Sequence, residues 1–363
     1  MNLGIIGGGQ LGRMLALAAH PLGIRTRVLE PSLSASAAHV AGHVVAPYDD
    51  RDALERFATG LDVATYEFEN VPVESARWLA ERVPVRPAPA ALEASQDRVV
   101  EKTTFQERAI PTAAFAAVDD AAGLAEAGER LGSPLVLKTR RWGYDGKGQA
   151  IVRSAADLQA AWRELGARPL IAEGFIRFDR ELSILAVRSV DGDVLCYPLF
   201  ENLHEGGILR RTTFPAARVA DEMQREAETY ARRMLEALDY VGVLAIELFD
   251  VGGALLANEM APRVHNSGHC TIEGARTSQF ENHVRAVCGL PLGAVHPIGH
   301  SVMINLIGAA PPIRELLAVT GAHVHLYDKQ PRPGRKIGHV TVCGDDPGEV
   351  AKRADRLLAM TRR

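Results

Sequence analysis

The chain has 363 residues, a formal net charge of −4 and a hydrophobic content of 47%. This length predicts two or three domains with cores of their own, and the weakly acidic balance argues against a general nucleic-acid-binding protein. Four cysteines without C-x-x-C spacing indicate free thiols in the cytoplasm, with neither a zinc site nor disulfides. No uncharged apolar run approaches the roughly 18 residues of a membrane span, and a strand begins at once, so we expect no membrane contact and no signal peptide.

Residues 1–83 alternate strand and helix patterns, which predicts a parallel α/β layer. Strands are expected at residues 3–6, 26–30 and 63–66. Residues 7–12, Gly-Gly-Gly-Gln-Leu-Gly, have the G-x-G-x-x-G spacing of a dinucleotide site, and Glu30 closes the second strand as the acidic partner. On their own they leave open NAD(P) binding, another phosphate ligand, and a tight turn that only needs small residues. Residues 67–71 leave the third strand at the carboxyl edge, where open α/β sheets bind ligands.

Three prolines, Pro84, Pro87 and Pro89, interrupt this alternation and indicate a linker. An amphipathic helix over residues 97–109, which carries Lys102, then opens a second unit. Ala-rich helices are expected around residues 119–131 and 155–165, with strands at 134–137 and from 150. These elements predict a small α+β piece that resembles a lid.

A glycine-rich segment, residues 138–149, lies between those two strands and begins with Lys138. Glycines let backbone N–H groups converge on an anion without Cβ obstruction, and the lysines add positive charge. A polyphosphate is the natural ligand, although the segment lacks G-x-x-x-x-G-K-[ST] and is therefore not a Walker A loop. A basic hairpin tip in solvent is the alternative.

The next apolar strand, residues 170–176, contains Glu173. A hinge with apolar neighbours suits an adenine ring that is recognised along one backbone edge and packed between aliphatic side chains. An exposed glutamate at the end of a strand is the alternative. A long helix is expected over residues 220–238.

Two glutamates stand inside otherwise apolar strands, Glu247 in residues 243–249 and Glu259 in residues 255–260. Burying two neighbouring carboxylates is costly unless a cation lies between them. Carboxylates on a rigid hairpin, with phosphate oxygens completing the shell, are a usual way to bind Mg²⁺. A two-residue turn would place Glu247 opposite Asn258, so a shared face requires an odd-length turn or a bulge.

Residues 261–269, Ala-Pro-Arg-Val-His-Asn-Ser-Gly-His, follow directly. The histidines lack a third partner at zinc-binding spacing, and Arg263 with backbone N–H groups favours a small oxyanion. Further on, four cations lie within eight residues of a Pro- and Gly-rich loop: Lys329, Arg332, Arg335 and Lys336. That density favours a phosphate clamp, with solvated charge as the alternative.

Together these stretches resemble the ATP-grasp superfamily and, more narrowly, the ATP-dependent carboxyaminoimidazole ribonucleotide synthases of bacterial purine biosynthesis. The blocks that carry the resemblance are residues 9–14 (Gly-Gln-Leu-Gly-Arg-Met), 143–149, 202–204 (Asn-Leu-His), 258–269, 303–308 (Met-Ile-Asn-Leu-Ile-Gly) and 332–339. The combination of blocks 258–269 and 332–339 is specific, whereas the glycine loop alone identifies only an ATP-grasp enzyme.

The resemblance implies an α/β and α+β chain with an ATP-grasp fold. An N-terminal Rossmann-like pre-ATP-grasp domain would cover residues 1–95, the ATP-grasp domain 96–296 with a glycine-rich lid at 110–180, and a small C-terminal domain 297–363. The implied reaction converts ATP, bicarbonate and aminoimidazole ribonucleotide into the carboxyamino product, ADP and phosphate, with Mg²⁺ as cofactor. The expected partners are these small molecules and a second copy of the chain in a homodimer, with no nicotinamide, nucleic acid or membrane.

The resemblance also implies roles for individual residues. The nucleotide would contact Lys102, Lys138, Gly143, Tyr144, Asp145, Gly146, Lys147, Gly148, Gln149, Glu173, Gly174, Phe175, Ile176, Glu181, His204, Asn258 and Glu259. The ribonucleotide and bicarbonate would contact Gly9, Gln10, Leu11, Glu69, Tyr144, Lys147, Arg263, His265, Asn266, Ser267, Gly268, Lys329, Arg335 and Lys336. Glu247 and Glu259 would bind Mg²⁺. The catalytic groups would be Lys138, Arg263 and His265, the last as a proton acceptor or as a positional group.

Three alternatives stay open. A formate-dependent glycinamide ribonucleotide transformylase shares the first turn, the nucleotide site and the metal pair, but residues 265–269 and 332–339 favour the carboxylating enzyme. A nicotinamide-dependent oxidoreductase rests on residues 7–12 and Glu30 alone. A non-catalytic nucleotide-binding regulator requires ATP binding without substrate-dependent hydrolysis. Trp142 departs from the family, which often has glycine there, and would stiffen the glycine-rich cover.

Overall fold

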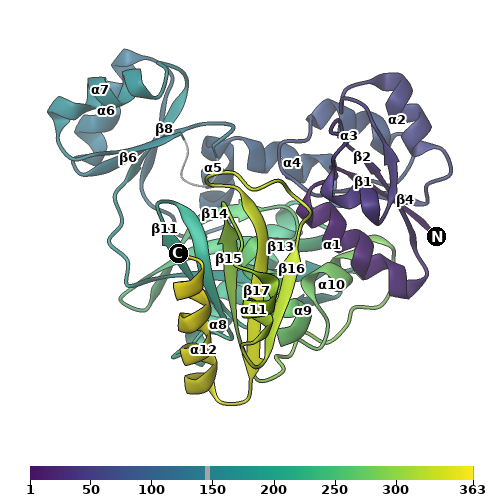
Figure 1. Cartoon of the computed structure of the whole chain (residues 1–363). Helices are drawn as coiled ribbons and strands as arrows, with labels where there is room; N and C mark the ends of the chain where they lie inside the picture. The colour runs from purple at the N-terminus through teal and green to yellow at the C-terminus, as the bar shows by residue number, and fades with distance from the viewer. Residues whose placement is uncertain (144–147, 363) are drawn as a thin grey trace.

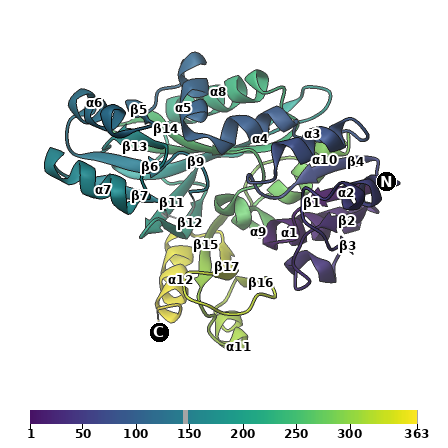
Figure 2. The ribbon, with the colours of Figure 1, turned by 90° about the horizontal axis from the view of Figure 1, so that it is seen from above.

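The computed structural model describes residues 1–143 and 148–362. Its described strands form three sheets: a four-stranded N-terminal sheet, a nine-stranded central sheet and a second four-stranded sheet. Figures 1 and 2 show the two smaller sheets on opposite sides of the central one. The predicted mixture of α/β and α+β structure is confirmed. Within these residues, no helix has the length and apolar character needed to cross a bilayer.

The N-terminal sheet is parallel throughout, with the order β3-β2-β1-β4. Its strands are β1 (Asn2–Ile6), β2 (Arg25–Leu29), β3 (Gly42–Val44) and β4 (Val63–Tyr66). The predicted parallel layer is confirmed, but β3 escapes prediction because it has only three residues and none is buried. Around the sheet lie α1 (Gln10–Ala19), α2 (Arg51–Ala58), α3 (Val73–Ala80) and α4 (Pro89–Gln96), with 3₁₀ turns at His20–Leu22 and Ser36–His39.

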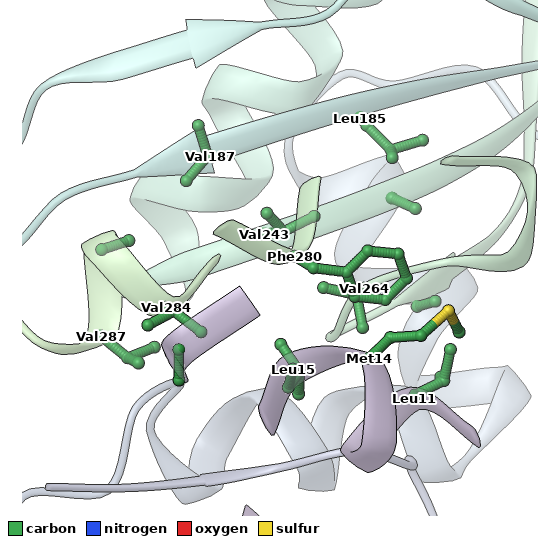
Figure 3. Packing of buried hydrophobic residues seen from close by; sticks show 14 of the residues in the cluster. Leu11, Met14, Leu15, Leu185, Val187, Val243, Val264, Phe280, Val284 and Val287 are labelled. Carbon is green, nitrogen blue, oxygen red and sulfur yellow. The ribbon is translucent and has the colours of Figure 1, made fainter. Parts of the chain in front are cut away.

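Helix α1 begins directly after the glycine turn and packs against α10 (Gln279–Val287), which lies on the central sheet. Leu11, Met14 and Leu15 of α1 share one buried cluster with Phe280 and Val284 of α10 (Figure 3). Burying a side chain of this size contributes about 1.5–3 kcal/mol. The packing therefore fixes the position of the glycine turn relative to the central sheet.

The second small sheet is antiparallel, with the order β5-β8-β6-β7. Its strands are β5 (Phe115–Val118), β6 (Leu135–Thr139), β7 (Gln149–Val152) and β8 (Leu170–Gly174). It packs against α6 (Ala121–Leu131) and α7 (Leu158–Glu164), and an exposed 3₁₀ turn at Ala155–Asp157 leads into α7. The predicted Ala-rich helices and flanking strands are confirmed. Strands β6 and β7 enclose the glycine-rich segment, of which residues 144–147 lie outside the described part of the chain.

The central sheet has the order β14-β13-β9-β11-β12-β15-β17-β16, with β10 also paired to β9. Its strands are β9 (Arg180–Arg188), β10 (Val194–Cys196), β11 (Phe200–Glu205), β12 (Ile208–Phe214), β13 (Gly242–Val251), β14 (Ala254–Ala261), β15 (His300–Ile307), β16 (Ala322–Leu326) and β17 (Lys336–Gly344). The remaining helices are α5 (Arg98–Glu107), α8 (Asp221–Ala237), α9 (Thr271–Gly274), α11 (Ile313–Leu317), α12 (Pro347–Met360) and a 3₁₀ helix at Asn266–Cys270. Because β12 pairs with β15, the C-terminal strands continue the same sheet.

The two faces of this sheet bury different helices. Ile184 of β9 lies in one core with Met234 of α8, whereas its neighbour Leu185 lies in the other core with Phe280 of α10. This alternation is the period-two pattern of a strand covered on both faces. The middle strands of the sheet are therefore well packed on both faces, and they hold the side chains that they carry in place.

The hairpin β13–β14 contains the bulge that the sequence required. Gly252 and Gly253 form a two-residue turn, and Leu248 pairs with Ala257 as such a turn dictates. Between Leu248 and Glu247 the register shifts by one residue, so that Glu247 pairs with Glu259 and Asn258 is the extra residue. The condition for two carboxylates on one face is thereby confirmed.

Candidate active site

A cavity of about 510 Å³ lies where the three sheets meet. The N-terminal unit contributes Gln10 and Leu11, the second small sheet contributes Lys138, and the C-terminal strands contribute Lys336. The predicted site residues that line the cavity are Gln10, Leu11, Glu69, Lys138, Gly143, Gln149, Glu181, His204, Glu247, Asn258, Glu259, Arg263, His265, Asn266 and Lys336. Stretches that are more than 300 positions apart in the chain thus meet at one cavity.

The glycine turn uses its N–H groups within the protein. Gly8 N–H donates to Glu30 Oε2 over 3.0 Å, and Gly9 and Gly12 N–H both donate to the Glu67 carboxylate. Burial raises the pKa of Glu67, while the two N–H groups and Lys329 oppose that rise. A dinucleotide phosphate would need these same N–H groups. The occupied turn therefore counts against the nicotinamide alternative.

Lys329 does not line the cavity, but it contacts Gln10, which does. Its ammonium group donates to Gln10 Oε1, and burial lowers its pKa. The preceding loop is tied to the same unit, since Ser36 donates to the Tyr327 carbonyl over 2.5 Å. Of the other loop cations, Lys336 lines the cavity, and Arg335 donates to the Gln330 carbonyl over 3.1 Å.

Two lysines share one buried carboxylate. Lys138 Nζ lies 3.0 Å and Lys102 Nζ lies 3.5 Å from Glu173 Oε2. Burial opposes ionisation of Glu173, but Lys102 and Lys138 hold its pKa below the usual value. Glu173 is 3% exposed, so the alternative of an exposed glutamate is wrong. Its side chain orients the two lysines, and Lys138 presents the charge to the cavity.

The paired glutamates each have a cationic or imidazole neighbour. Arg98 NH1 lies 2.7 Å from Glu259 Oε2, and His265 Nε2 lies 3.3 Å from Glu247 Oε1. Burial would raise the pKa of Glu247, but the hydrogen bond from His265 is the largest of the effects that instead lower it to about 2. Burial would also raise the pKa of Glu259, but the positive charge of Arg98 holds that pKa below the usual value.

These residues fit a hard divalent cation. Glu247 and Glu259 offer carboxylate oxygens, and the buried amide oxygen of Asn258 beside them has no hydrogen-bond partner. Among residues 1–143 and 148–362, no cluster of three or more His, Cys, Asp or Glu forms a metal site by itself. The remaining ligands would therefore come from phosphate oxygens and water, as is common for Mg²⁺.

Arg263 is held by the N-terminal unit. Its Nε donates to Glu69 Oε2 over 2.5 Å, and its NH1 donates to the Val264 carbonyl over 3.0 Å. Burial opposes ionisation of Glu69, yet Arg263 lowers its pKa below the usual value. This geometry points the guanidinium along the cavity wall, where it can bind an oxyanion.

A chain of buried hydrogen bonds orients His265. Thr212 donates to Asn202 over 2.9 Å, Asn202 donates to Ser183 over 3.0 Å, and Ser183 donates to Ser267 over 2.8 Å. The Ser267 hydroxyl lies 2.9 Å from His265 Nδ1, and its main-chain N–H also points to that nitrogen. Nδ1 is therefore an acceptor, and neutral His265 carries its proton on Nε2.

The sequence assigned no site role to the wall residues Arg98, Gly207, Leu209, Phe249 and His269, whereas Glu67, Phe68 and Asn70 belong to residues 67–71, which were expected at the ligand-binding edge. Two of them carry a detectable signal. Arg98 precedes Lys102 by one helical turn, and Phe249 follows Glu247 by two strand positions, so both share a face with a predicted residue. Phe249 stacks on Phe178 with ring centroids 4.6 Å apart. The pair adds a flat apolar surface near the residues that are predicted to bind the nucleotide.

Other predicted residues do not line the cavity. Among the described residues, these are Gly9, Lys102, Gly148, Glu173, Gly174, Phe175, Ile176, Ser267, Gly268, Lys329 and Arg335. Tyr144, Asp145, Gly146 and Lys147 are outside the described residues. The assigned contacts of all these residues with ligands stay predictions.

Three family models match the chain. A ribonucleotide synthetase preATP-grasp domain matches residues 1–96, an ATP-grasp domain matches 103–280, and a phosphoribosylaminoimidazole carboxylase C-terminal domain matches 301–353. The chain is 50% identical over 346 residues to the N5-carboxyaminoimidazole ribonucleotide synthase of Pseudomonas aeruginosa, covering 95% of each chain.

Solved structures are similar over their whole length. The N5-carboxyaminoimidazole ribonucleotide synthetase from Thermus thermophilus gives a TM-score of 0.95 at 55% identity, covering 99% of this chain and 98% of that chain. The N5-carboxyaminoimidazole synthase from Aspergillus clavatus, in complex with ADP and 5-aminoimidazole ribonucleotide, gives a TM-score of 0.93 at 34% identity, covering 100% and 98%. The expected ATP-grasp fold, with its pre-ATP-grasp and C-terminal domains, is confirmed.

Proposed function

This chain belongs to the N5-carboxyaminoimidazole ribonucleotide synthase family, and from that premise we propose that it uses ATP and bicarbonate to carboxylate the exocyclic amine of 5-aminoimidazole ribonucleotide. The observation that carries the proposal is the pairing of Glu247 with Glu259 in a cavity that also contains Lys138 and Arg263. One cavity thereby offers ligands for a divalent cation, a cation for phosphate and a guanidinium for bicarbonate. The enzyme is an ATP-dependent ligase that forms a C–N bond.

In this proposal the nucleotide lies between the second small sheet and the hairpin β13–β14. Lys138, oriented by Glu173, binds the transferred phosphate, and Lys102 supports it from behind. Glu181 binds the ribose together with His204, to which it is hydrogen-bonded over 2.7 Å. Glu247 and Glu259 would hold Mg²⁺, which when bound would neutralise charge on the phosphate groups of the nucleotide.

The reaction then takes two steps. A bicarbonate oxygen attacks the γ-phosphorus, the bond to the β-phosphate oxygen breaks, and carboxyphosphate and ADP form. The amine nitrogen next attacks the carboxyl carbon, phosphate leaves with its bonding electrons, and the nitrogen loses one proton. Arg263 orients the bicarbonate for the first attack. Its guanidinium is fixed by Glu69 in the same cavity as Glu247 and Glu259.

His265 has a positional role in this scheme. Its Nε2 carries the proton and faces Glu247, so in this geometry it donates a hydrogen bond and does not accept a proton there. A donor at this point fixes the carboxylate of the metal site.

The ribonucleotide lies on the N-terminal side of the cavity in this proposal. Gln10 and Glu69 face the sugar and the imidazole, while Lys329 and Lys336 bind the phosphate. Two cations on a loop anchored to the N-terminal unit provide a fixed phosphate site. Arg335 joins them when the phosphate is bound.

We also propose which part of the chain binds each substrate, where in the cell the enzyme is located and its oligomeric state. Residues 1–95 and 297–363 bind the ribonucleotide, residues 96–296 bind the nucleotide, and residues 110–180 cover it. The four cysteines are free, which supports a cytoplasmic location. A homodimer is proposed from the resemblance alone.

The test is phosphate release from MgATP with 5-aminoimidazole ribonucleotide, with and without bicarbonate, with formate and glycinamide ribonucleotide run in parallel. ADP and the carboxyamino product should appear only when bicarbonate and the imidazole substrate are both present. Turnover with formate instead would assign the chain to the transformylase. ATP binding without turnover in either mixture would favour the non-catalytic alternative.

A further inference from the structure

One face of helix α5 contacts three successive points of strand β14 around the bulge. Arg98 pairs with the Glu259 carboxylate at 2.7 Å, and Lys102 donates to the Ala257 carbonyl over 3.4 Å. Between them, Glu101 Oε1 accepts the main-chain N–H of Met260 over 2.6 Å. These three side chains lie within one turn of the helix and therefore project from the same side.

The Met260 N–H needs an acceptor from outside the sheet. Strand β14 is the terminal strand of the central sheet as described, and outside it only Ala257 pairs with another backbone segment, in a bridge to Thr112, so no strand accepts the Met260 N–H. A buried N–H without a partner is costly, and Glu101 is itself only 2% exposed. The Glu101–Met260 hydrogen bond therefore replaces the ladder bond that an additional strand would supply.

This hydrogen bond lies one residue after Glu259. The bulge leaves Asn258 unpaired and turns Glu259 toward Glu247. A slip to regular pairing would remove the bulge and send Glu259 to the opposite face of the strand. Glu101 fixes Met260 on one side of the bulge, and Lys102 fixes Ala257 on the other. Together these two contacts oppose that slip.

We propose that Glu101 is a positioning residue for the divalent-cation site, which holds the β14 bulge so that Glu259 shares a face with Glu247. The inference rests on the proposed function, because it takes Glu247 and Glu259 as the metal ligands. Glu101 touches neither the cation nor a substrate. Its contribution is the carboxylate oxygen that accepts the Met260 N–H. The amide oxygen of a glutamine at position 101 would accept the same N–H.

The experiment compares three variants of the full chain. Glu101→Met keeps the length and shape of the side chain but removes the acceptor, and Glu101→Gln restores an acceptor without the charge. Glu107→Met is the matched control, since Glu107 is on the same helix and exposed. The Mg²⁺ concentration that gives half-maximal ATP turnover is measured for each, together with ADP binding in EDTA by calorimetry.

Glu101→Met should raise the half-maximal Mg²⁺ concentration by about 10- to 100-fold, the usual effect of losing a group that orients a metal ligand. Glu101→Gln should stay within about threefold of the wild type, and Glu107→Met should not differ from it. ADP binding in EDTA should be the same in all four proteins, because the nucleotide lysines are unaltered.

Three outcomes would overturn the inference. They are an unchanged Mg²⁺ requirement in Glu101→Met, an equal defect in Glu101→Gln, and a parallel loss of ADP binding in EDTA, which would indicate collapsed packing. Failure of the proposed function is distinguishable, because the wild-type protein would then show no Mg²⁺-dependent turnover of ATP with bicarbonate and the imidazole substrate.

Discussion

Removing the Ser183 hydroxyl should test how the buried chain orients His265. Ser183 is 0% exposed, donates to Ser267 and accepts from Asn202. Alanine leaves the Asn202 amide without its acceptor and the Ser267 hydroxyl without its donor. A buried polar group left unsatisfied costs about 1–3 kcal/mol, so we expect Ser183→Ala to lower the free energy of unfolding by about 2 kcal/mol.

The kinetic effect should be separable from the loss of stability. Once Ser183 is absent, the Ser267 hydroxyl is free to rotate, and Nδ1 of His265 loses its fixed donor. Misorientation of a group in an active site commonly lowers turnover by about tenfold or more, so we expect about a tenfold loss in kcat/KM for bicarbonate. The KM for ATP should stay unchanged.

Urea denaturation and initial-rate kinetics, both at 25 °C, are the assays. Ser301→Ala is the control, because Ser301 is 1% exposed and donates over 3.3 Å to the Phe214 carbonyl, which is not part of the hydrogen-bond chain from Thr212 to Ser267. It should lose stability with unchanged kcat/KM for bicarbonate. Wild-type kinetics in Ser183→Ala, or an equal kinetic defect in Ser301→Ala, would refute the reasoning.

Three further predictions concern Trp142 in the glycine-rich segment, Glu247 in the proposed metal site and Lys329 in the proposed phosphate site. Trp142 has φ 66° and is 67% exposed, so Trp142→Gly should relieve roughly 1 kcal/mol of backbone strain and leave the thermal midpoint unchanged or higher; a clearly lower midpoint would contradict this. The pKa of Glu247 is lowered to about 2 from 4.5, so its ionised form contributes stability above pH 4.5 that is lost as the pH falls toward 2. Over that interval the thermal midpoint of Glu247→Gln should fall less steeply than that of the wild type, and parallel curves would be evidence against the Glu247–His265 pairing. Lys329→Met should raise the KM for the ribonucleotide about tenfold or more, as expected when a charge-assisted contact is lost, with the KM for ATP unaltered; equal changes in both constants would refute a ribonucleotide-specific role.

Local patterns in the sequence identified many of the elements before residue 262, because the signals concerned act over short distances. The apolar run of β4 and the amphipathic pattern of α5 are examples, and the structure adds that Asp97 caps α5 by accepting the N–H groups of Val99 and Val100. The bulge in β14 was reached by a different route. Two carboxylates in an apolar hairpin are acceptable only if they share a face, and that condition demanded an irregular register.

The glycine turn shows where a local motif is insufficient. Residues 7–12 match the dinucleotide fingerprint, but the groups that fill the turn, Glu30 and Glu67, arrive from the ends of two other strands. Which anion a turn binds depends on what the neighbouring strands place beside it. No property of the six residues themselves contains that information.

The sequence by itself determined the class of fold and the types of residue available for binding phosphate, bicarbonate and a divalent cation, since these follow from composition, periodicity and motif spacing. Its resemblance to known synthases indicated the family. Only the tertiary structure decided which of those residues meet. Arg98 pairs with Glu259 across 161 positions, and Lys329 contacts Gln10 across 319. The same holds for the hydrogen bonds that orient His265 and the acceptor that Glu101 offers to Met260. Such contacts depend on how sheets and helices pack over the whole chain, and packing is a property of all the elements together.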